Sequence, residues 1–430
     1  MTKRIHIAAL VLGAASLVLL AVLAVGPAPA PAQAQEDDAV FTVGETTLES
    51  FYPRGMSFTV QADSSAGEIT RATLFLVLRP GTRERFAAGY NTDLDAWVAE
   101  PYRLRGGPPP WLDFDYYWVF GDEADNSFET EAQYGVYADN TRTWYSIDTE
   151  DITLYWFGGL PELGEYVAQA MEVMREQYTI AWGRTISFKP LAVLFPPDRV
   201  WDEMVEGGNN PNAGGFTSPG DGYTVQRLPG EYTEAEFAEL TARCGGMYNN
   251  GLATNPTEWR ILREVHTILH EVTHQYQSDF RLNAPTWFTE GQADFFAGLS
   301  GFSSRGANGR LANYVSLGYD LPTLQGGGPG ANVANPLEDG CVALGYNIGD
   351  SFLQWLTTTY GLETHLAVIQ NMPGNGMEAA LEIATGTSFL DLENRWRATF
   401  GLTPVSVLPT VTPFVLPTAP IPSVPTAPAG

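Results

Sequence analysis

Basic side chains are scarce in this sequence, and their scarcity excludes a large class of partners. The 430 residues hold 23 Lys and Arg against 50 Asp and Glu, which gives a formal net charge of −27. Proteins that bind nucleic acids rely on Lys and Arg to neutralise phosphates. We therefore expect no nucleic-acid partner, and we interpret the negative charge as a means of keeping the chain soluble.

Cysteine is also rare, because only Cys244 and Cys341 are present. Neither belongs to a Cys-x-x-Cys pair, so these two thiolates alone do not predict a zinc site. In an oxidising compartment an even pair can form one disulfide, and we expect a Cys244–Cys341 bond. The alternative is two buried free thiols.

The composition is that of a globular protein without repeats or a phosphate-binding loop. Charged residues make up 17% of the chain, too few for a mainly disordered protein, and 44% of residues are hydrophobic. The glycines at 326–328 lack the strand-to-helix context of a phosphate loop. A chain of this length can bury one sizeable core and a smaller one, so we expect two domains.

Residues 1–34 have the pattern of an export signal. Lys3 and Arg4 precede an apolar run over residues 7–25, and Ala-Gln-Ala at 32–34 offers a cleavage site. The run of about 19 residues approaches the length that spans a bilayer. The segment is therefore either cleaved or retained as a membrane anchor. Both outcomes predict a secreted or extracytoplasmic protein, in the second case anchored to the outer face of the membrane.

Residues 37–150 show the two-residue alternation of half-buried strands. Phe58 and Val60 alternate with polar residues, and a second run containing Leu74 and Leu76 follows. This pattern predicts a β-sandwich-like domain. Further strands are expected at 113–120, 133–137 and 143–147.

From residue 151 the pattern changes to alternating strands and helices. Pro161 begins a helix, and residues 191–195 form a short buried strand. The predicted fold class is therefore α+β, with a mainly helical C-terminal half in the domain at 151–402. The Pro- and Thr-rich residues 403–430 are expected to form a disordered tail. Later helices are expected at 256–279, 285–299, 346–360 and 388–400.

The helix expected at 256–279 carries the motif His-Glu-Val-Thr-His at residues 270–274. Asn255 can cap this helix, and an apolar stripe anchors it in a core. The two histidines lie one turn apart on one face, so both can bind one metal ion, whereas Glu271 turns aside toward the water to be activated. The alternative is an amphipathic helix whose histidines bind no metal.

Residues 285–294 begin the next helix and complete a ligand set. Glu290 can join His270 and His274 as the third ligand of a single Zn²⁺, which leaves the fourth position for water. Asp294 lies one turn beyond Glu290 and can accept the other ring N–H of a ligand histidine.

His266 has the same spacing from His270 as His270 has from His274. Eight residues of helix rise about 12 Å, which is too far for His266 and His274 to bind one ion at about 2.1 Å each. We therefore do not expect His266 to be a ligand.

The sequence resembles the glutamate-zincin peptidases, the thermolysin-like and aminopeptidase-like group, and specifically the peptidase MA-like families. The resemblance rests on the motif at 270–274 and on the Pro-x-Trp-Phe-x-Glu-Gly-x-Ala segment at 285–293. Residues 346–353 and 392–396 look like the C-terminal helices of that family. The resemblance covers roughly residues 151–402.

This resemblance implies a zincin-type metallopeptidase domain. Its zinc ligands would be His270, His274 and Glu290, with Glu271 as general base and Asp294 as the partner of a ligand histidine. Fifteen residues separate His274 from Glu290, fewer than in thermolysin itself, which implies a trimmed connection between the two helices.

The resemblance also singles out Tyr346 as a candidate to stabilise the oxyanion, because a phenol O–H can donate to developing negative charge. The alternative is a packing residue. His365 lies late in a helical region and does not offer a histidine for this role.

These features together predict an exported zinc-dependent metallopeptidase that hydrolyses a peptide or protein substrate. Zinc would polarise the scissile carbonyl, and Glu271 would take a proton from water and pass it to the leaving amine. The stretch at 214–217 precedes the motif helix and is a candidate edge strand for binding extended substrate. The alternatives are a catalytically silent zinc-binding envelope or adhesion module, and a structural exported protein without metal.

Overall fold

The computed structural model describes residues 40–102, 107–196, 215–244, 253–302, 304–330 and 344–406. The expected export signal lies outside the described residues, and so does nearly all of the expected tail. The expected disulfide lies outside them too, because Cys341 is not described. Among the described residues, no helix combines the length and the apolarity needed to cross a bilayer.

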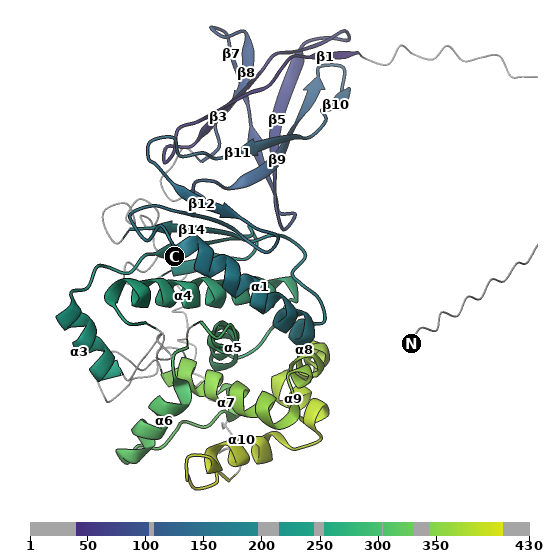
Figure 1. Cartoon of the computed structure of the whole chain (residues 1–430). Helices are drawn as coiled ribbons and strands as arrows, with labels where there is room; N and C mark the ends of the chain where they lie inside the picture. Colours follow the sequence, from purple (N-terminus) through teal and green to yellow (C-terminus); the bar gives the residue numbers. More distant parts are fainter. Residues whose placement is uncertain are drawn as a thin grey trace, which may run out of the picture.

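The protein is a mixed α+β structure, with strands in its N-terminal part and helices in its C-terminal half (Figure 1). The strands are β1 (Phe41–Val43), β2 (Thr47–Ser50), β3 (Met56–Val60), β4 (Ala62–Ser64), β5 (Ile69–Leu78), β6 (Arg83–Ala87), β7 (Gly89–Asn91), β8 (Ala96–Ala99), β9 (Asp113–Asp122), β10 (Ser127–Glu129), β11 (Gln133–Val136), β12 (Tyr145–Asp148), β13 (Thr153–Trp156), β14 (Leu191–Phe195), β15 (Gly215–Ser218) and β16 (Tyr223–Arg227).

The N-terminal strands form two main sheets that share one core. One sheet has the order β10-β9-β5-β6 with β11 also paired to β9, and the other has the order β2-β3-β8-β7. The alternation expected around Phe58 and Leu74 is confirmed, because both side chains are buried and their polar neighbours are not. The inward-facing side chains of β3, β5 and β9 are Met56, Phe58, Val60, Ala72, Leu74, Leu76, Leu78, Phe114, Tyr116, Trp118 and Phe120.

A further sheet, which we call the mixed sheet, follows in the order β12-β13-β14-β16-β15. β13, β14 and β16 are parallel, whereas β12 and β15 run antiparallel at the two edges. The expectation that residues 143–147 belong with the N-terminal strands is wrong, because β12 pairs with β13. Side-chain alternation is the same in either sheet, so the sequence pattern does not reveal which partner a strand has.

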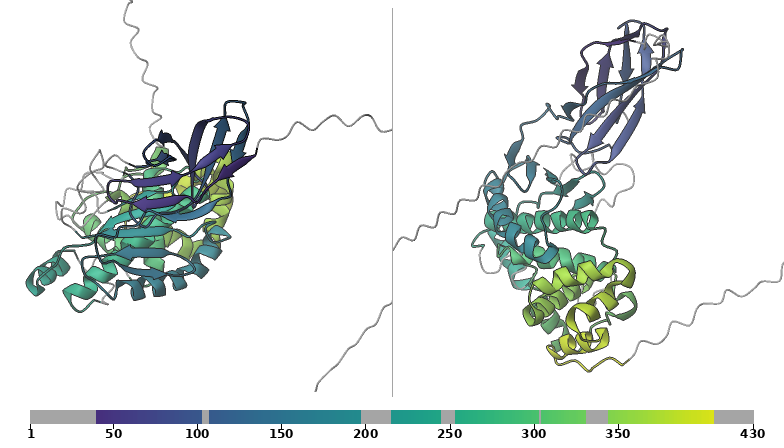
Figure 2. Two further views of the ribbon diagram at one scale, coloured as in Figure 1. Left: turned by 90° about the horizontal axis from the view of Figure 1, so that it is seen from above. Right: turned by 90° about the vertical axis from the view of Figure 1, so that its right-hand side faces the viewer.

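The mixed sheet is buried on both faces, which explains the unbroken apolar run of β14. Val193 and Phe195 join the core of the N-terminal strands, whereas Ala192 and Leu194 pack with the helices. Figure 2 shows the same layering from another side, with the N-terminal strands and the C-terminal helices on opposite sides of this sheet. The chain thus has two main cores that meet at one sheet.

The helices cover the face of the mixed sheet that points away from the N-terminal strands, and they continue into the C-terminal half. The helices expected after Pro161 and at 256–279, 285–299, 346–360 and 388–400 are confirmed, whereas α3, α6, α8 and α9 were not expected. Their bounds are α1 (Leu163–Trp182), α3 (Glu234–Cys244), α4 (Pro256–Asp279), α5 (Thr286–Leu299), α6 (Ala307–Ser316), η1 (Gln325–Gly327), α7 (Leu344–Tyr360), α8 (Glu363–Asn375), α9 (Met377–Thr385) and α10 (Phe389–Ala398).

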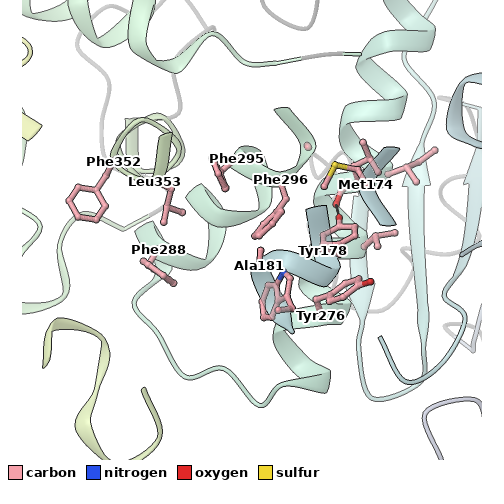
Figure 3. Close-up of a cluster of buried hydrophobic side chains, with 14 of the residues drawn as sticks. Met174, Tyr178, Ala181, Tyr276, Phe288, Phe295, Phe296, Phe352 and Leu353 are labelled. Atoms are coloured by element: carbon pink, nitrogen blue, oxygen red, sulfur yellow. Dashed lines mark hydrogen bonds between the residues drawn. The ribbon is translucent and has the colours of Figure 1, made fainter. Parts of the chain in front are cut away.

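The motif helix α4 is fixed at its start and along its buried face. The side chain of Asn255 accepts a hydrogen bond from the backbone N–H of Glu258 at 3.0 Å, as expected for its cap. Further along, Tyr276 stacks on Tyr178 of α1 with ring centroids 4.2 Å apart (Figure 3). The hydroxyl of Tyr178 also lies 3.1 Å from the hydroxyl of Thr273. These contacts hold the motif rigidly against α1.

Helices α5 and α7 cross at a pair of glycines. A methyl group on Gly349 would lie 2.0 Å from the backbone oxygen of Trp287, and one on Gly291 would lie 2.2 Å from the Cα of Gly349. Only hydrogen atoms fit at this crossing. The close approach brings Glu290 of α5 and Tyr346 of α7 to the same place.

We predict that Gly349→Ala destabilises the protein by about 2–3 kcal/mol, because the added methyl group meets backbone and the two helices must separate. Gly309→Ala is the matched control, since Gly309 lies in α6 with open space where its methyl group would be. The control should leave the free energy of unfolding unchanged or raise it slightly. Urea unfolding of both variants gives the measurement. Equal midpoints for Gly349→Ala and the wild type would contradict the tight crossing.

Candidate metal centre

Three donor atoms from α4 and α5 converge on one point. His270 Nε2 and His274 Nε2 are 3.1 Å apart. Glu290 Oε2 lies 3.3 Å from the first and 3.5 Å from the second. In tetrahedral coordination with ligand distances of about 2.1 Å, neighbouring ligand atoms lie about 3.4 Å apart. The triangle of donor atoms therefore has the size that one zinc ion requires.

Asp294 lies behind His270 and determines which ring nitrogen carries its proton. Asp294 Oδ1 is 2.8 Å from His270 Nδ1. An ionised carboxylate only accepts hydrogen bonds, so Nδ1 donates and Nε2 keeps its lone pair for the triangle. Arg305 Nε, 3.1 Å from the other oxygen of Asp294, stabilises the carboxylate. Although burial opposes ionisation, Arg305, His266 and His270 lower the pKa of Asp294 below its ordinary value.

Gln277 plays the corresponding part behind His274. Its amide nitrogen donates to the backbone oxygen of Thr289 at 2.8 Å, and that oxygen can only accept. The amide oxygen of Gln277 must then face His274 Nδ1, which lies 2.8 Å away. His274 therefore donates from Nδ1, and its Nε2 lone pair also points into the triangle.

The triangle needs a positive charge at its centre. Two lone pairs and a carboxylate face one another at 3.1 to 3.5 Å, so either a proton or a metal ion must lie among them. Burial alone would lower the pKa of His270, but the hydrogen bonds to Asp294 and Glu290 raise it to about 10. Despite its burial, the two histidines lower the pKa of Glu290. The donor set of two imidazoles and one carboxylate fits zinc.

A second group, His266 with His270 and Asp294, also has donor atoms close enough together for one ion. His266 Nε2 lies 3.2 Å from the same Asp294 oxygen that contacts His270. This group is fully buried, whereas His270, His274 and Glu290 line an open cleft. Because Asp294 already pairs with Arg305, we interpret His266 and Asp294 as residues that hold His270 in position and not as ligands of a second metal ion.

The cleft beside the triangle has a volume of about 520 Å³ and is walled on one side by β15. Glu271 lines this cleft, and its carboxylate accepts a short hydrogen bond from the hydroxyl of Thr217 on β15. Thr217 thus fixes the carboxylate beside the triangle. The stretch expected as an edge strand forms β15, Gly215–Ser218, at the edge of the mixed sheet. Gly214 lies outside the described residues.

Tyr346 reaches the same cleft from α7. Its ring lies 5.9 Å from the ring of His270 in a near-parallel arrangement, and Tyr346 lines the cleft together with Glu290. The Arg305 guanidinium lies 4.8 Å from the centroid of the Tyr346 ring. Burial, followed by the charge of Glu290, raises the pKa of Tyr346. The hydroxyl therefore stays protonated and can donate a hydrogen bond.

The structure thus brings His270, Glu271, His274, Glu290 and Tyr346 to one cleft and places Asp294 behind it. His365 lies elsewhere, buried in α8. Sequence reasoning missed Gln277 and Arg305, and it placed Thr217 only in the expected edge strand without its role in orienting Glu271. Of these, Gln277 left a signal, because a side chain three residues beyond His274 shares its helical face.

No family model and no curated protein matches the chain. Among solved structures, aminopeptidase A of Legionella pneumophila in complex with aspartic acid shares 12% identity, with a TM-score of 0.33 and coverage of 82% of this chain. The chain spans 32% of the length of that aminopeptidase. A polysaccharide deacetylase from Bacillus cereus shares 10% identity, with a TM-score of 0.18 and coverage of 53% of this chain and 78% of its own. Cwp6 from Clostridium difficile shares 9% identity, with a TM-score of 0.16 and coverage of 47% and 40%. Such low TM-scores do not establish a common fold.

We predict that zinc binding at pH 7.5 releases about one proton, because His270 has a pKa of about 10 in the metal-free site and must be neutral to bind the ion. Zinc affinity should accordingly rise with pH through the neutral range. Calorimetry in two buffers of different ionisation enthalpy measures the proton count.

Asp294→Asn is the matched control for this measurement. The amide can still accept from His270 Nδ1 but removes the negative charge that raises the pKa of the ring. This variant should release fewer protons and bind zinc more weakly. Zinc binding to the wild type without proton release would mean that His270 is neutral in the metal-free protein.

Proposed function

We propose that this protein is a zinc-dependent metallopeptidase of the glutamate-zincin type. The observation that carries the proposal is the convergence of His270 Nε2, His274 Nε2 and Glu290 Oε2 in an open cleft that also contains Glu271. A ligand set alone is compatible with a structural metal site. A carboxylate beside the ligands that coordinates nothing itself is the arrangement that hydrolysis requires.

When bound, the zinc ion polarises the scissile carbonyl and makes water more acidic. Glu271 takes the proton of the attacking water and delivers it to the leaving amine. Thr217 orients the Glu271 carboxylate by its short hydrogen bond, which limits the positions that the proton acceptor can adopt. Since Thr217 lies on β15, the position of the base is tied to the wall of the cleft.

The Tyr346 hydroxyl is placed to stabilise the negative charge that develops on the carbonyl oxygen. It lies at the Glu290 side of the triangle, and burial keeps it protonated. In this role it donates a hydrogen bond to the oxyanion. The gain is largest in the transition state, where the oxygen carries the most charge.

Extended substrate is proposed to bind along β15. Within the described sheet, β15 has only β16 as a hydrogen-bonded neighbour, so its other edge faces the cleft. A peptide added to this edge gains backbone hydrogen bonds that do not depend on its sequence. Its scissile bond would then pass between β15 and the helix that carries Glu271.

We further propose that the strands before β12 form a separate β-sandwich-like domain, that the glutamate-zincin domain extends from β12 to residue 402, and that the protein acts outside the cytoplasm. The layering of two cores around one sheet supports the division. The export proposal rests on the composition of residues 1–34.

Glu271→Gln should bind one zinc ion per chain like the wild type and lose at least about 100-fold in kcat/KM, because the amide cannot accept the proton. A mixed peptide library digested by both proteins, with metal content measured in parallel, provides the test. Full activity of Glu271→Gln with zinc bound would remove Glu271 from the mechanism. Stoichiometric zinc without cleavage in the wild type would favour the catalytically silent module.

Tyr346→Phe should lower kcat by about 100-fold with little change in KM, because the hydroxyl acts mainly on the transition state. Steady-state kinetics on a peptide that the wild type cleaves separates the two constants. Tyr145→Phe is the control, since Tyr145 is exposed on β12, at the opposite edge of the sheet from β15, and does not line the cleft. A loss below threefold in Tyr346→Phe would leave the tyrosine with a packing role only.

A further inference from the structure

His365 is a buried histidine that the proposed mechanism does not use. Its side chain is 1% exposed and lies between two aromatic rings, Trp182 of α1 and Phe296 of α5. The ring centroids are 5.0 and 5.1 Å away, both in edge-to-face arrangements. Burial lowers the pKa of His365 to about 4, so the ring is neutral at physiological pH. A neutral imidazole has one donor and one acceptor nitrogen.

The backbone decides which nitrogen of His365 donates. Nδ1 lies 2.7 Å from the backbone oxygen of Ala181, which can only accept. Nδ1 therefore carries the proton, and Nε2 must accept. Its partner is the amide nitrogen of Gln292, 2.6 Å away. These hydrogen bonds therefore determine which end of the Gln292 amide is nitrogen and which is oxygen.

The chain of hydrogen bonds continues from Gln292 to the metal centre. The amide oxygen of Gln292 accepts from Gln277 Nε2 at 2.7 Å, and the amide oxygen of Gln277 accepts from His274 Nδ1 at 2.8 Å. Each group thus faces the next with a donor opposite an acceptor. The relay runs from α8 through α5 to α4, and its amides are almost wholly buried.

We propose that His365 is a positioning residue of the metal centre: through Gln292 and Gln277 it holds His274 in the tautomer whose Nε2 is free to bind metal. This proposal rests on the proposed zinc site. The backbone oxygen of Thr289 also accepts from Gln277 Nε2 and favours the same orientation, so Gln277 has two acceptors, one of which His365 holds in place through Gln292. If Gln292 and Gln277 both turned over, an amide N–H would face His274 Nδ1, and the proton of His274 would have to move to Nε2. That tautomer cannot bind a metal ion through Nε2.

Burial makes the direction of the relay costly to disturb. A buried amide without a partner loses the hydrogen bonds that it has in water, and an apolar neighbourhood offers no replacement. Trp182 and Phe296 surround the His365 ring with such a neighbourhood. Removing the acceptor at His365 Nε2 leaves the Gln292 amide nitrogen without that partner, so of the two acceptors that orient Gln277 Nε2 only the Thr289 oxygen is still held in place.

Two substitutions of His365 separate this role from simple packing. In His365→Gln the new side-chain oxygen takes the place of Nε2 and can accept from Gln292, which preserves the relay. In His365→Asn the shorter amide takes the place of Nδ1 and can donate to Ala181, but nothing accepts from Gln292. Both variants are neutral, polar and smaller than histidine, so a packing role predicts similar losses for both.

The experiment measures zinc affinity of the full chain by competition with a chelator, together with the thermal unfolding midpoint of each metal-free variant. We expect His365→Asn to bind zinc about 10-fold or more weakly than the wild type, in the range found when partners of metal ligands are removed. His365→Gln should stay within about threefold of the wild type. Equal zinc affinities for the two variants, whether both weakened or both unchanged, would overturn the positioning role, and so would a greater loss in His365→Gln.

The metal-free unfolding midpoints show whether a weakened variant has lost its fold, because a loss of zinc affinity without a matching difference in midpoint belongs to the relay. Failure of the proposed function looks different from failure of the relay. A wild type that binds no zinc contradicts the metal centre itself. A wild type that binds zinc while the Asn and Gln variants do not differ contradicts only the relay.

Discussion

The electrostatic demand at one point determines much of this structure. Two imidazole lone pairs and a carboxylate converge at 3.1 to 3.5 Å, an arrangement that repels itself unless a cation lies at its centre. Each of the two imidazoles is oriented toward that point by a hydrogen-bond partner on its other ring nitrogen. Asp294 directs His270, and Gln277 directs His274. The metal centre is thus built from outside inward, as a shell of fixed donors and acceptors around a place for positive charge.

The fold supplies the rigidity that such a shell needs. Aromatic stacking between Tyr178 and Tyr276 holds α4 against α1, and the contact of Gly291 with Gly349 presses α5 onto α7. Ligands from α4 and α5 and the tyrosine from α7 can then meet with little freedom of movement. The mixed sheet, buried on both faces, anchors the edge strand that carries Thr217. Base, ligands and substrate edge are in this way positioned by one continuous framework.

The acidic side chains of this protein lie in two different environments, the surface and the interior. Most of them are spread over the surface, where their negative charge favours solubility. A few carboxylates are buried, and each of these depends on its surroundings. Asp294 is stabilised by Arg305 and two histidines, whereas burial raises the pKa of Asp350 to about 8. The charge of a carboxylate near the centre is therefore decided by its neighbours and not by its identity.

The sequence by itself determined the local features of this protein. It predicted α4 from its cap at Asn255 and its apolar stripe, the strand alternation around Phe58, and a ligand set on consecutive helices, because these depend on spacing along the chain. Tertiary structure alone decided which sheet receives β12, that Thr217 meets Glu271, and that His365 lies at the end of a relay to His274. Contacts such as that between His365 and Ala181, 184 residues apart, leave no periodic trace in the sequence, since they arise only when separate elements pack together.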